Sequence, residues 1–267
     1  MYRGFNLEVA EDDYLKFYKQ DISSLGSRIL EEQKSTVNKE INTFCDKDGC
    51  IDASKLGADW FPEIEADIFL SHSHKDEKIA IFLAGWLYKN FELETFIDSC
   101  VWGYANKLLN EIDNRYCLNP VRKTYDYKMR NLSTSHVYMM LSTALASMID
   151  KTECVFFLNT PKSITFDDTI KTNKTKTLSP WIYNEITMTK LIRTNKPPRI
   201  IDRDKKLFEE TLACLFDFTF RYDVNIDHLK DINFDNLKKW ELEYSNKKPN
   251  VDKYDSLDIL YDIWDER

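Results

Sequence analysis

The stretch Asp67-Ile-Phe-Leu-Ser71, followed at once by His72-Ser-His-Lys-Asp76, decides the fold class of this 267-residue chain. A short apolar run stops at polar residues, and a helical pattern of apolar side chains begins at Glu77. A buried strand followed by a helix is typical of a parallel α/β domain. Open parallel sheets bind their ligands at the carboxyl ends of the strands. The polar residues after Leu70 are therefore candidates for a functional site.

The alternation of apolar runs and helical patterns continues along the chain. We expect strands at residues 66–71, 93–97, 154–159, 199–201 and 216–222, and helices at 77–91, 105–116, 135–149, 180–193, 205–215 and 234–244. Strands that alternate with helices predict an α/β fold with a central parallel sheet and helices on both faces.

Three regions differ in character. Residues 1–61 show helical spacing of apolar side chains and are expected to form an N-terminal helical extension. The extension either packs on the main domain or supplies a helix for self-association or partner binding. The main domain is expected at 62–245, with a polar and basic insertion at about 117–133, and residues 246–267 form an acidic C-terminal tail.

Composition narrows the functional classes. The formal charge of -8 gives no overall basic footprint for nucleic acid. No apolar run reaches the roughly 18 residues that a membrane helix needs. The six cysteines are scattered without a C-x-x-C pair, and the four histidines lack zinc-ligand spacing. We therefore expect a cytoplasmic protein with reduced thiols, no metal, and no nucleic-acid or membrane partner.

Two further motifs carry polar residues that fit a site. In the first, a strand ends at Asp98, and a loop then places Trp102 beside Gly103. Trp102 is either displayed by this loop or part of the core. In the second, Leu178–Ile186, Trp181 and Glu185 are four residues apart and so lie on one face of a helix. Most helical glutamates are solvated, which is the alternative for Glu185.

Taken in order, the three motifs resemble those of a TIR (Toll/interleukin-1 receptor) domain. The first strand of that family ends F-[IL]-S-[HY], as Phe69–His72 does, and its third strand is followed by S-x-W-x-x-x-E-[IL], as in Ser179–Ile186. The resemblance is greatest to prokaryotic TIR proteins, including those of antiphage defence such as the Thoeris systems. It implies a flavodoxin-like TIR fold. The 117–133 insertion and His72, where many animal members carry tyrosine, depart from the family pattern.

The resemblance also implies an activity, the cleavage of the nicotinamide–ribose bond of NAD+. In NAD-cleaving TIR domains the glutamate at the position of Glu185 is catalytic, and the tryptophan at the position of Trp181 lines the pocket. Nicotinamide departs neutral from a positively charged state, so one carboxylate that stabilises the ribosyl cation is sufficient. Substrate contacts are expected from Ser71, His72, Ser73, Asp98, Trp102 and Trp181. NAD+ is the substrate, and no cofactor is expected.

The products and the partners remain open at the level of sequence. Attack by water gives ADP-ribose, and attack by a group of the substrate gives a cyclic ADP-ribose isomer. The family implies TIR–TIR self-association and a downstream effector that responds to the product. The alternatives are a non-catalytic TIR adaptor that signals by homotypic assembly, and a nucleotide-sensing module in which the basic 117–133 segment contacts phosphates.

Overall fold

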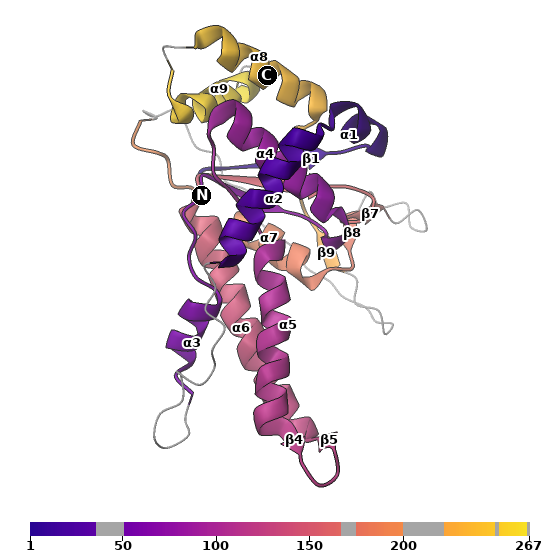
Figure 1. The fold of residues 1–267 in the computed structure, drawn as a ribbon. Helices are drawn as coiled ribbons and strands as arrows, with labels where there is room; N and C mark the ends of the chain where they lie inside the picture. The colour runs from indigo at the N-terminus through magenta and orange to yellow at the C-terminus, as the bar shows by residue number, and fades with distance from the viewer. Residues whose placement is uncertain (36–50, 167–174, 200–221, 249–250, 266–267) are drawn as a thin grey trace.

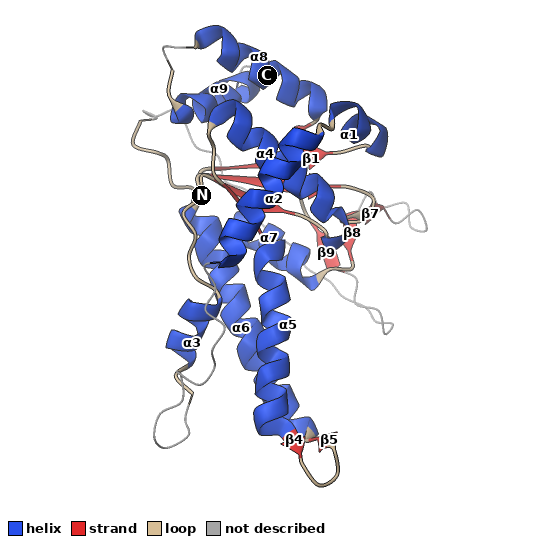
Figure 2. Cartoon of the chain, in the orientation of Figure 1, coloured by secondary structure: helices blue, strands red, loops and turns tan. Residues whose placement is uncertain are grey.

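A five-stranded sheet forms the centre of the molecule (Figures 1 and 2). The computed structural model describes residues 1–35, 51–166, 175–199, 222–248 and 251–265. In these residues the strand order is β10-β1-β6-β2-β3, and every neighbouring pair is parallel. The strands are β1 (Arg3–Glu8), β2 (Ile68–Ser71), β3 (Thr95–Ile97), β6 (Cys154–Asn159) and β10 (Lys230–Ile232). The predicted central parallel sheet is thus confirmed.

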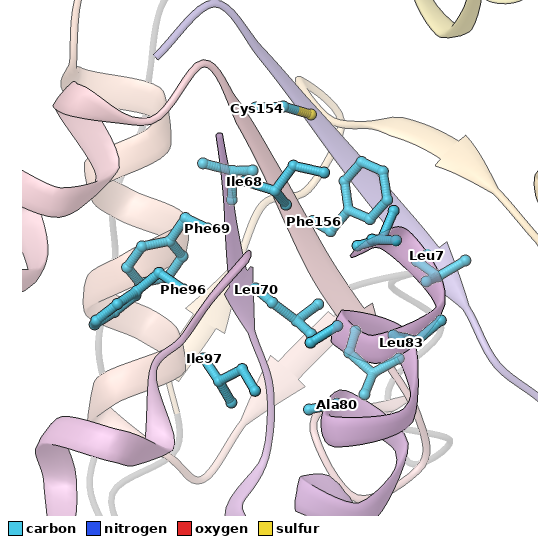
Figure 3. Close-up of a cluster of buried hydrophobic side chains, with 14 of the residues drawn as sticks. Leu7, Ile68, Phe69, Leu70, Ala80, Leu83, Phe96, Ile97, Cys154 and Phe156 are labelled. Atoms are coloured by element: carbon cyan, nitrogen blue, oxygen red, sulfur yellow. The ribbon is translucent and has the colours of Figure 1, made fainter. Parts of the chain in front are cut away.

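Both faces of the sheet are buried, because each strand presents apolar side chains alternately to the two sides. Leu70 of β2 lies near Leu83 and Ala80 of helix α4 (Glu77–Phe91), whereas Phe69 turns to the other face beside Phe96 (Figure 3). On that second face, Phe157 of β6 belongs to the same apolar cluster as Ile182 and Ile186 of helix α7 (Pro180–Leu191). Helices therefore cover both faces.

The remaining elements surround this core. Helices α1 (Glu11–Phe17), α2 (Gln20–Ser35) and α3 (Ala53–Trp60) follow β1, and the short η2 (His74–Asp76) precedes α4. The chain continues with α5 (Ser99–Ile112), η3 (Asp113–Cys117) and α6 (Tyr127–Lys151), and ends with α8 (Phe234–Lys247) and α9 (Lys253–Asp265). Two small antiparallel sheets join β4 (Leu118–Asn119) to β5 (Thr124–Tyr125), and β7 (Thr165–Phe166) to β8 (Thr175–Thr177) and β9 (Tyr222–Val224).

Helix α2 packs on α4 at very short range. A Cβ atom on Gly26 would lie 1.8 Å from the carbonyl oxygen of Ile81, and one on Gly85 would lie 2.1 Å from that of Ile22. Only a residue without a Cβ fits at either position, so the two glycines set the distance between the helices. The same helix covers the sheet edge, because Gln33 Nε2 donates to the carbonyl of Thr95 at 2.7 Å.

Helices α5 and α6 extend away from the sheet and end in the β4–β5 hairpin (Figure 1). The predicted insertion at 117–133 forms this hairpin and the first turns of α6. We refer to residues 113–143 as the projection. Asp126 begins α6 by accepting a hydrogen bond from the backbone nitrogen of Met129 at 2.9 Å, which satisfies one of the free amides of the first helical turn.

Two regional predictions require correction. Residues 1–61 are not a purely helical extension, because Arg3–Glu8 forms β1 between β6 and β10. Residues 246–267 do not form a separate acidic tail. Helix α9 packs on β1, with Trp264 6.2 Å and Tyr261 6.3 Å from Phe5 between ring centroids. The aromatic side chains of α9 alternate with aspartates in the sequence, and they hold the helix against the core.

Some expected elements fall outside the described residues, namely the strand ending at 201, the helix at 205–215 and nearly all of the strand at 216–222. Within the described ranges, no helix combines the length and the apolar character needed to cross a membrane.

Candidate functional site

The candidate site lies where the direction of chain progression across the sheet changes. From β2 the chain passes through α4 to β3 on one side, and it later returns to place β6 on the other side of β2. In open α/β sheets such a reversal leaves a crevice at the carboxyl ends of the two strands, where ligands bind. Ser71 ends β2 at this point, and α7 begins 21 residues after the end of β6.

Ser71 and Glu185, which the sequence assigned to one site as a substrate contact and a catalytic group, lie in direct contact. Ser71 Oγ donates a hydrogen bond of 2.5 Å to Glu185 Oε2. Helix α7 brings the carboxyl group there because Ser179 caps its first turn, accepting from the backbone nitrogen of Ile182 at 3.3 Å, and Pro180 occupies the first helical position. The helix face that carries Glu185 then packs against the sheet, and the side chain is only 1% exposed.

A second polar pair lies beside the first. His72 Nδ1 is 2.6 Å from Asp98 Oδ1, and the backbone nitrogen of His72 donates to Asp98 Oδ2 at 3.3 Å. Both side chains are fully buried. Since β2 and β3 are adjacent and parallel, the residues that follow Leu70 and Ile97 emerge at the same edge of the sheet. The pair is thus a direct result of the strand register.

Asp98 influences the pKa values of both Glu185 and His72. Burial and then repulsion from Asp98 raise the pKa of Glu185 well above its usual range, while the hydrogen bond from Ser71 opposes the shift. Burial lowers the pKa of His72, but attraction from Asp98 and the hydrogen bonds to Asp98 and Leu70 outweigh it and raise the pKa overall. The raised pKa of Glu185 favours its neutral form, and the raised pKa of His72 favours its protonated form.

A cavity of about 760 Å³ lies next to this cluster, a size typical of small-molecule sites. Helices α2, α4, α5, α6 and α7 contribute to its wall, and its polar lining includes Lys34, His74, Glu77, Ser99 and Lys107. Ser99 directly follows Asp98 in the chain and donates to Glu77 Oε1 at 3.2 Å. The buried carboxyl group of Glu185 is not part of the wall.

The three other predicted site residues, Trp181, Ser73 and Trp102, lie in different surroundings. Trp181 is half-buried and lines the cavity, with its ring 5.4 Å from that of Tyr138 in an edge-on arrangement. Ser73 caps η2 by accepting from the backbone nitrogen of Lys75 at 3.4 Å. Trp102 lies within α5, whose first residue is Ser99, so the predicted loop at 98–104 is wrong. Its side chain is outside the described part of the structure.

Sequence reasoning missed two groups near the site. Tyr138 comes from the middle of α6 and carries no motif, so only the packing of α6 against α7 brings it to the cavity. Asp76, buried at the start of α4, accepts from Thr160 Oγ1 at 2.6 Å and lies 3.4 Å from Lys162 Nζ. These contacts tie the loop after β6 to the loop after β2, and a sequence offers no signal for them.

Among the side chains that the structure describes, no group of three or more His, Cys, Asp and Glu residues is arranged to hold a metal ion. No protein-family model, curated protein or solved structure matches this chain.

Proposed function

We propose that this chain is a TIR-domain enzyme that cleaves the nicotinamide–ribose bond of NAD+. The observation that carries the proposal is the convergence of Glu185 with Ser71 and the His72–Asp98 pair beside a cavity lined by Trp181. Residues from three separate motifs, which span 114 positions from Ser71 to Glu185, meet at one edge of the sheet. Counted from β2, the strand order β3-β2-β6 agrees with the 2-1-3 order of a flavodoxin-like sheet, although β1, which precedes β2 in the chain, lies on the other side of β6.

Cleavage of the nicotinamide–ribose bond requires the protein to supply a negative charge and to position the substrate. When the nicotinamide leaves, positive charge develops on the ribose, and an ionised Glu185 stabilises that charge and holds the ribose hydroxyl groups. Trp181 and Tyr138 offer aromatic faces to the cationic nicotinamide ring. Ser71 positions the carboxyl group of Glu185 through its hydrogen bond.

The burial of Glu185 defines the step that must precede reaction. With 1% of its side chain exposed, Glu185 does not reach a ligand in the cavity. We propose that NAD+ binding moves the segment after β3, which carries Asp98 beside the carboxyl group and Ser99 in the cavity wall. Such a movement would reduce both the burial and the repulsion from Asp98 that raise the pKa of Glu185, and so favour the ionised form.

The same burial favours a second candidate, a non-catalytic TIR adaptor. In that role Glu185 is a neutral hydrogen-bonding group that holds α7 to the end of β2. Signalling would then depend on TIR–TIR assembly and not on turnover.

The experiment is an assay of purified protein with NAD+, in which nicotinamide, ADP-ribose and cyclic products are separated by chromatography. Glu185→Gln keeps the size and the hydrogen bond but removes the charge, and it is expected to slow nicotinamide release by about 100-fold or more. Glu111→Gln, an exposed position on α5, is the matched control and should retain full activity. Equal rates for Glu185→Gln and the wild type would refute the catalytic assignment, and no release by the wild type at any protein concentration would favour the adaptor.

If NAD+ is cleaved, the separated products decide between hydrolysis and cyclisation. A cyclic product would be suited to act as a signal for a separate effector, which fits a role in bacterial antiphage defence. Free ADP-ribose alone would fit depletion of NAD+.

A further inference from the structure

The projection concentrates exposed apolar side chains. Eight of the fourteen large hydrophobic side chains that are exposed in the described part of the chain lie between residues 116 and 139: Tyr116, Leu118, Val121, Tyr125, Tyr127, Met129, Leu132 and Met139. Val121, at the hairpin, is 90% exposed. Such a concentration of apolar surface on one feature is typical of an interaction site.

Part of this surface has the spacing of a helix-pairing seam. Met129, Leu132, His136, Met139 and Thr143 follow one another at steps of three, four, three and four residues along α6, and all five side chains are exposed. These steps are those of the a and d positions of a heptad, which place side chains in one stripe along a helix. The buried residues Val137, Leu141 and Leu145 lie on other faces of α6. The exposed stripe is therefore a second seam.

Charge distinguishes the hairpin end of the projection from the rest of the chain. Residues 113–132 contain five basic residues and two acidic residues, one of which, Asp113, pairs with Arg130, in a chain whose net charge is -8. At the other end of α6, Lys151 pairs with Glu63, and the N-terminal ammonium lies 3.9 Å from Asp150. The segment 51–65, whose helix α3 packs on α6, nevertheless carries four acidic residues and one basic residue. One end of α6 is thus basic, while acidic side chains flank the other.

We infer that the projection binds the projection of a second copy of this chain, with the two α6 helices antiparallel. A twofold axis near His136 would place Leu132 against Met139 of the partner subunit. Each basic hairpin would then lie beside the partner's acidic end of α6, whereas a parallel pair would bring two basic hairpins together. The twofold arrangement is self-complementary, as closed dimers require.

The exposed stripe contains none of the residues that line the cavity, which Tyr138 and Leu141 of the projection reach from other faces of α6, and the inference does not depend on NAD+ cleavage. It also lies outside the three motifs on which the TIR resemblance rests, and so differs from the TIR–TIR contacts that the family implies. Nucleic acid is the other partner that basic residues fit, but the exposed Met129, Leu132 and Met139 contribute nothing to phosphate binding.

The test uses the full chain in sedimentation velocity over a range of concentrations. The wild type is expected to form a dimer, and Leu132→Glu combined with Met139→Glu is expected to raise its dissociation constant at least ~10-fold. Leu242→Glu is the matched control, because Leu242 is 61% exposed on α8, outside the projection. A thermal melt of each variant checks that the fold is retained.

A cross-link tests the geometry. His136→Cys, which would lie next to its own copy at the axis, is expected to form a covalent dimer on mild oxidation, while Leu242→Cys is not. The inference is overturned by a wild type that stays monomeric throughout, by a dimer that the double substitution leaves unchanged, or by failure of His136→Cys to cross-link. Oligonucleotide binding by a monomer would assign the basic residues to nucleic acid and would likewise overturn it.

Discussion

Glu185 illustrates how one residue links sequence, environment and stability. Its position four residues after Trp181 indicated a site, and the structure places its carboxyl group on Ser71 and near Asp98. Those neighbours were predictable, because motif order and parallel strands bring them to one edge. The depth of burial was not, since it depends on how α7 packs against β6.

The raised pKa of Glu185 has a consequence for stability against pH. The folded state holds the proton more tightly than the unfolded chain, whose carboxyl group has its ordinary pKa of 4.5. The contribution is therefore complete below pH 4.5 and is lost as pH rises toward the higher folded pKa. Gln resembles the protonated acid at every pH, so Glu185→Gln should be more stable than the wild type at pH 7.5.

This prediction is checked by melting curves of both proteins between pH 5 and pH 8. A gain in melting temperature of at least ~2 °C at pH 7.5, which shrinks as the pH falls, is the expected pattern. His72, whose pKa is also raised, weakens stability in the same direction but is present in both proteins and cancels in the comparison. A constant difference across the pH range would show that Glu185 is already ionised in the fold.

Among the helices and strands, those with the strongest apolar patterns had their bounds predicted most accurately. The bounds of α4 and β6 agree with the predicted 77–91 and 154–159, because each has a long amphipathic or continuous apolar signal. Strand β1 was missed since Arg3–Glu8 mixes Gly4 and Asn6 with only two large apolar residues. Its partners, β6 and β10, are remote in sequence, so no local pattern identifies it.

The crossing of α2 and α4 gives a prediction for this scale. Gly26→Ala puts a methyl group 1.8 Å from the carbonyl oxygen of Ile81, and since backbone is the obstacle, the helices must separate. We expect a loss of about 3 kcal/mol in the free energy of unfolding. Gly103→Ala is the control, because its Cβ meets nothing within 4 Å, and it should gain ~0.5–1 kcal/mol from helix propensity. Urea unfolding measures both, and equal effects would contradict the packing argument.

For the whole molecule, the position of β1 shows that the chain is not a core domain with an added N-terminal extension. Phe5 is fully buried and contacts Phe156 of β6 as well as Tyr261 and Trp264 of α9, so the two ends of the described chain share one core. The sequence predicted a parallel sheet. It did not predict that residues 3–8 supply the strand between β10 and β6, because that pairing depends on packing between distant segments.

Deletion of residues 2–8 tests this integration. Loss of β1 separates β10 from β6 and exposes one flank of each, so we expect a protein without cooperative unfolding. Near-ultraviolet circular dichroism and a thermal melt of the deletion variant measure the outcome. A truncated protein that keeps a native spectrum and a sharp transition would show that residues 1–61 are an extension after all.

The place of β1 in the sheet also affects how the protein is made. Glu8 precedes Cys154 by 146 residues, so β1 leaves the ribosome long before either strand that pairs with it. At typical rates of synthesis of 5–20 residues per second, the interval is roughly 7–30 s. During that time the segment that forms β1, with Phe5 and Leu7 unburied and both edges unpaired, is open to the wrong partner. Nascent chains of this protein are thus expected to depend on holding chaperones until β6 emerges.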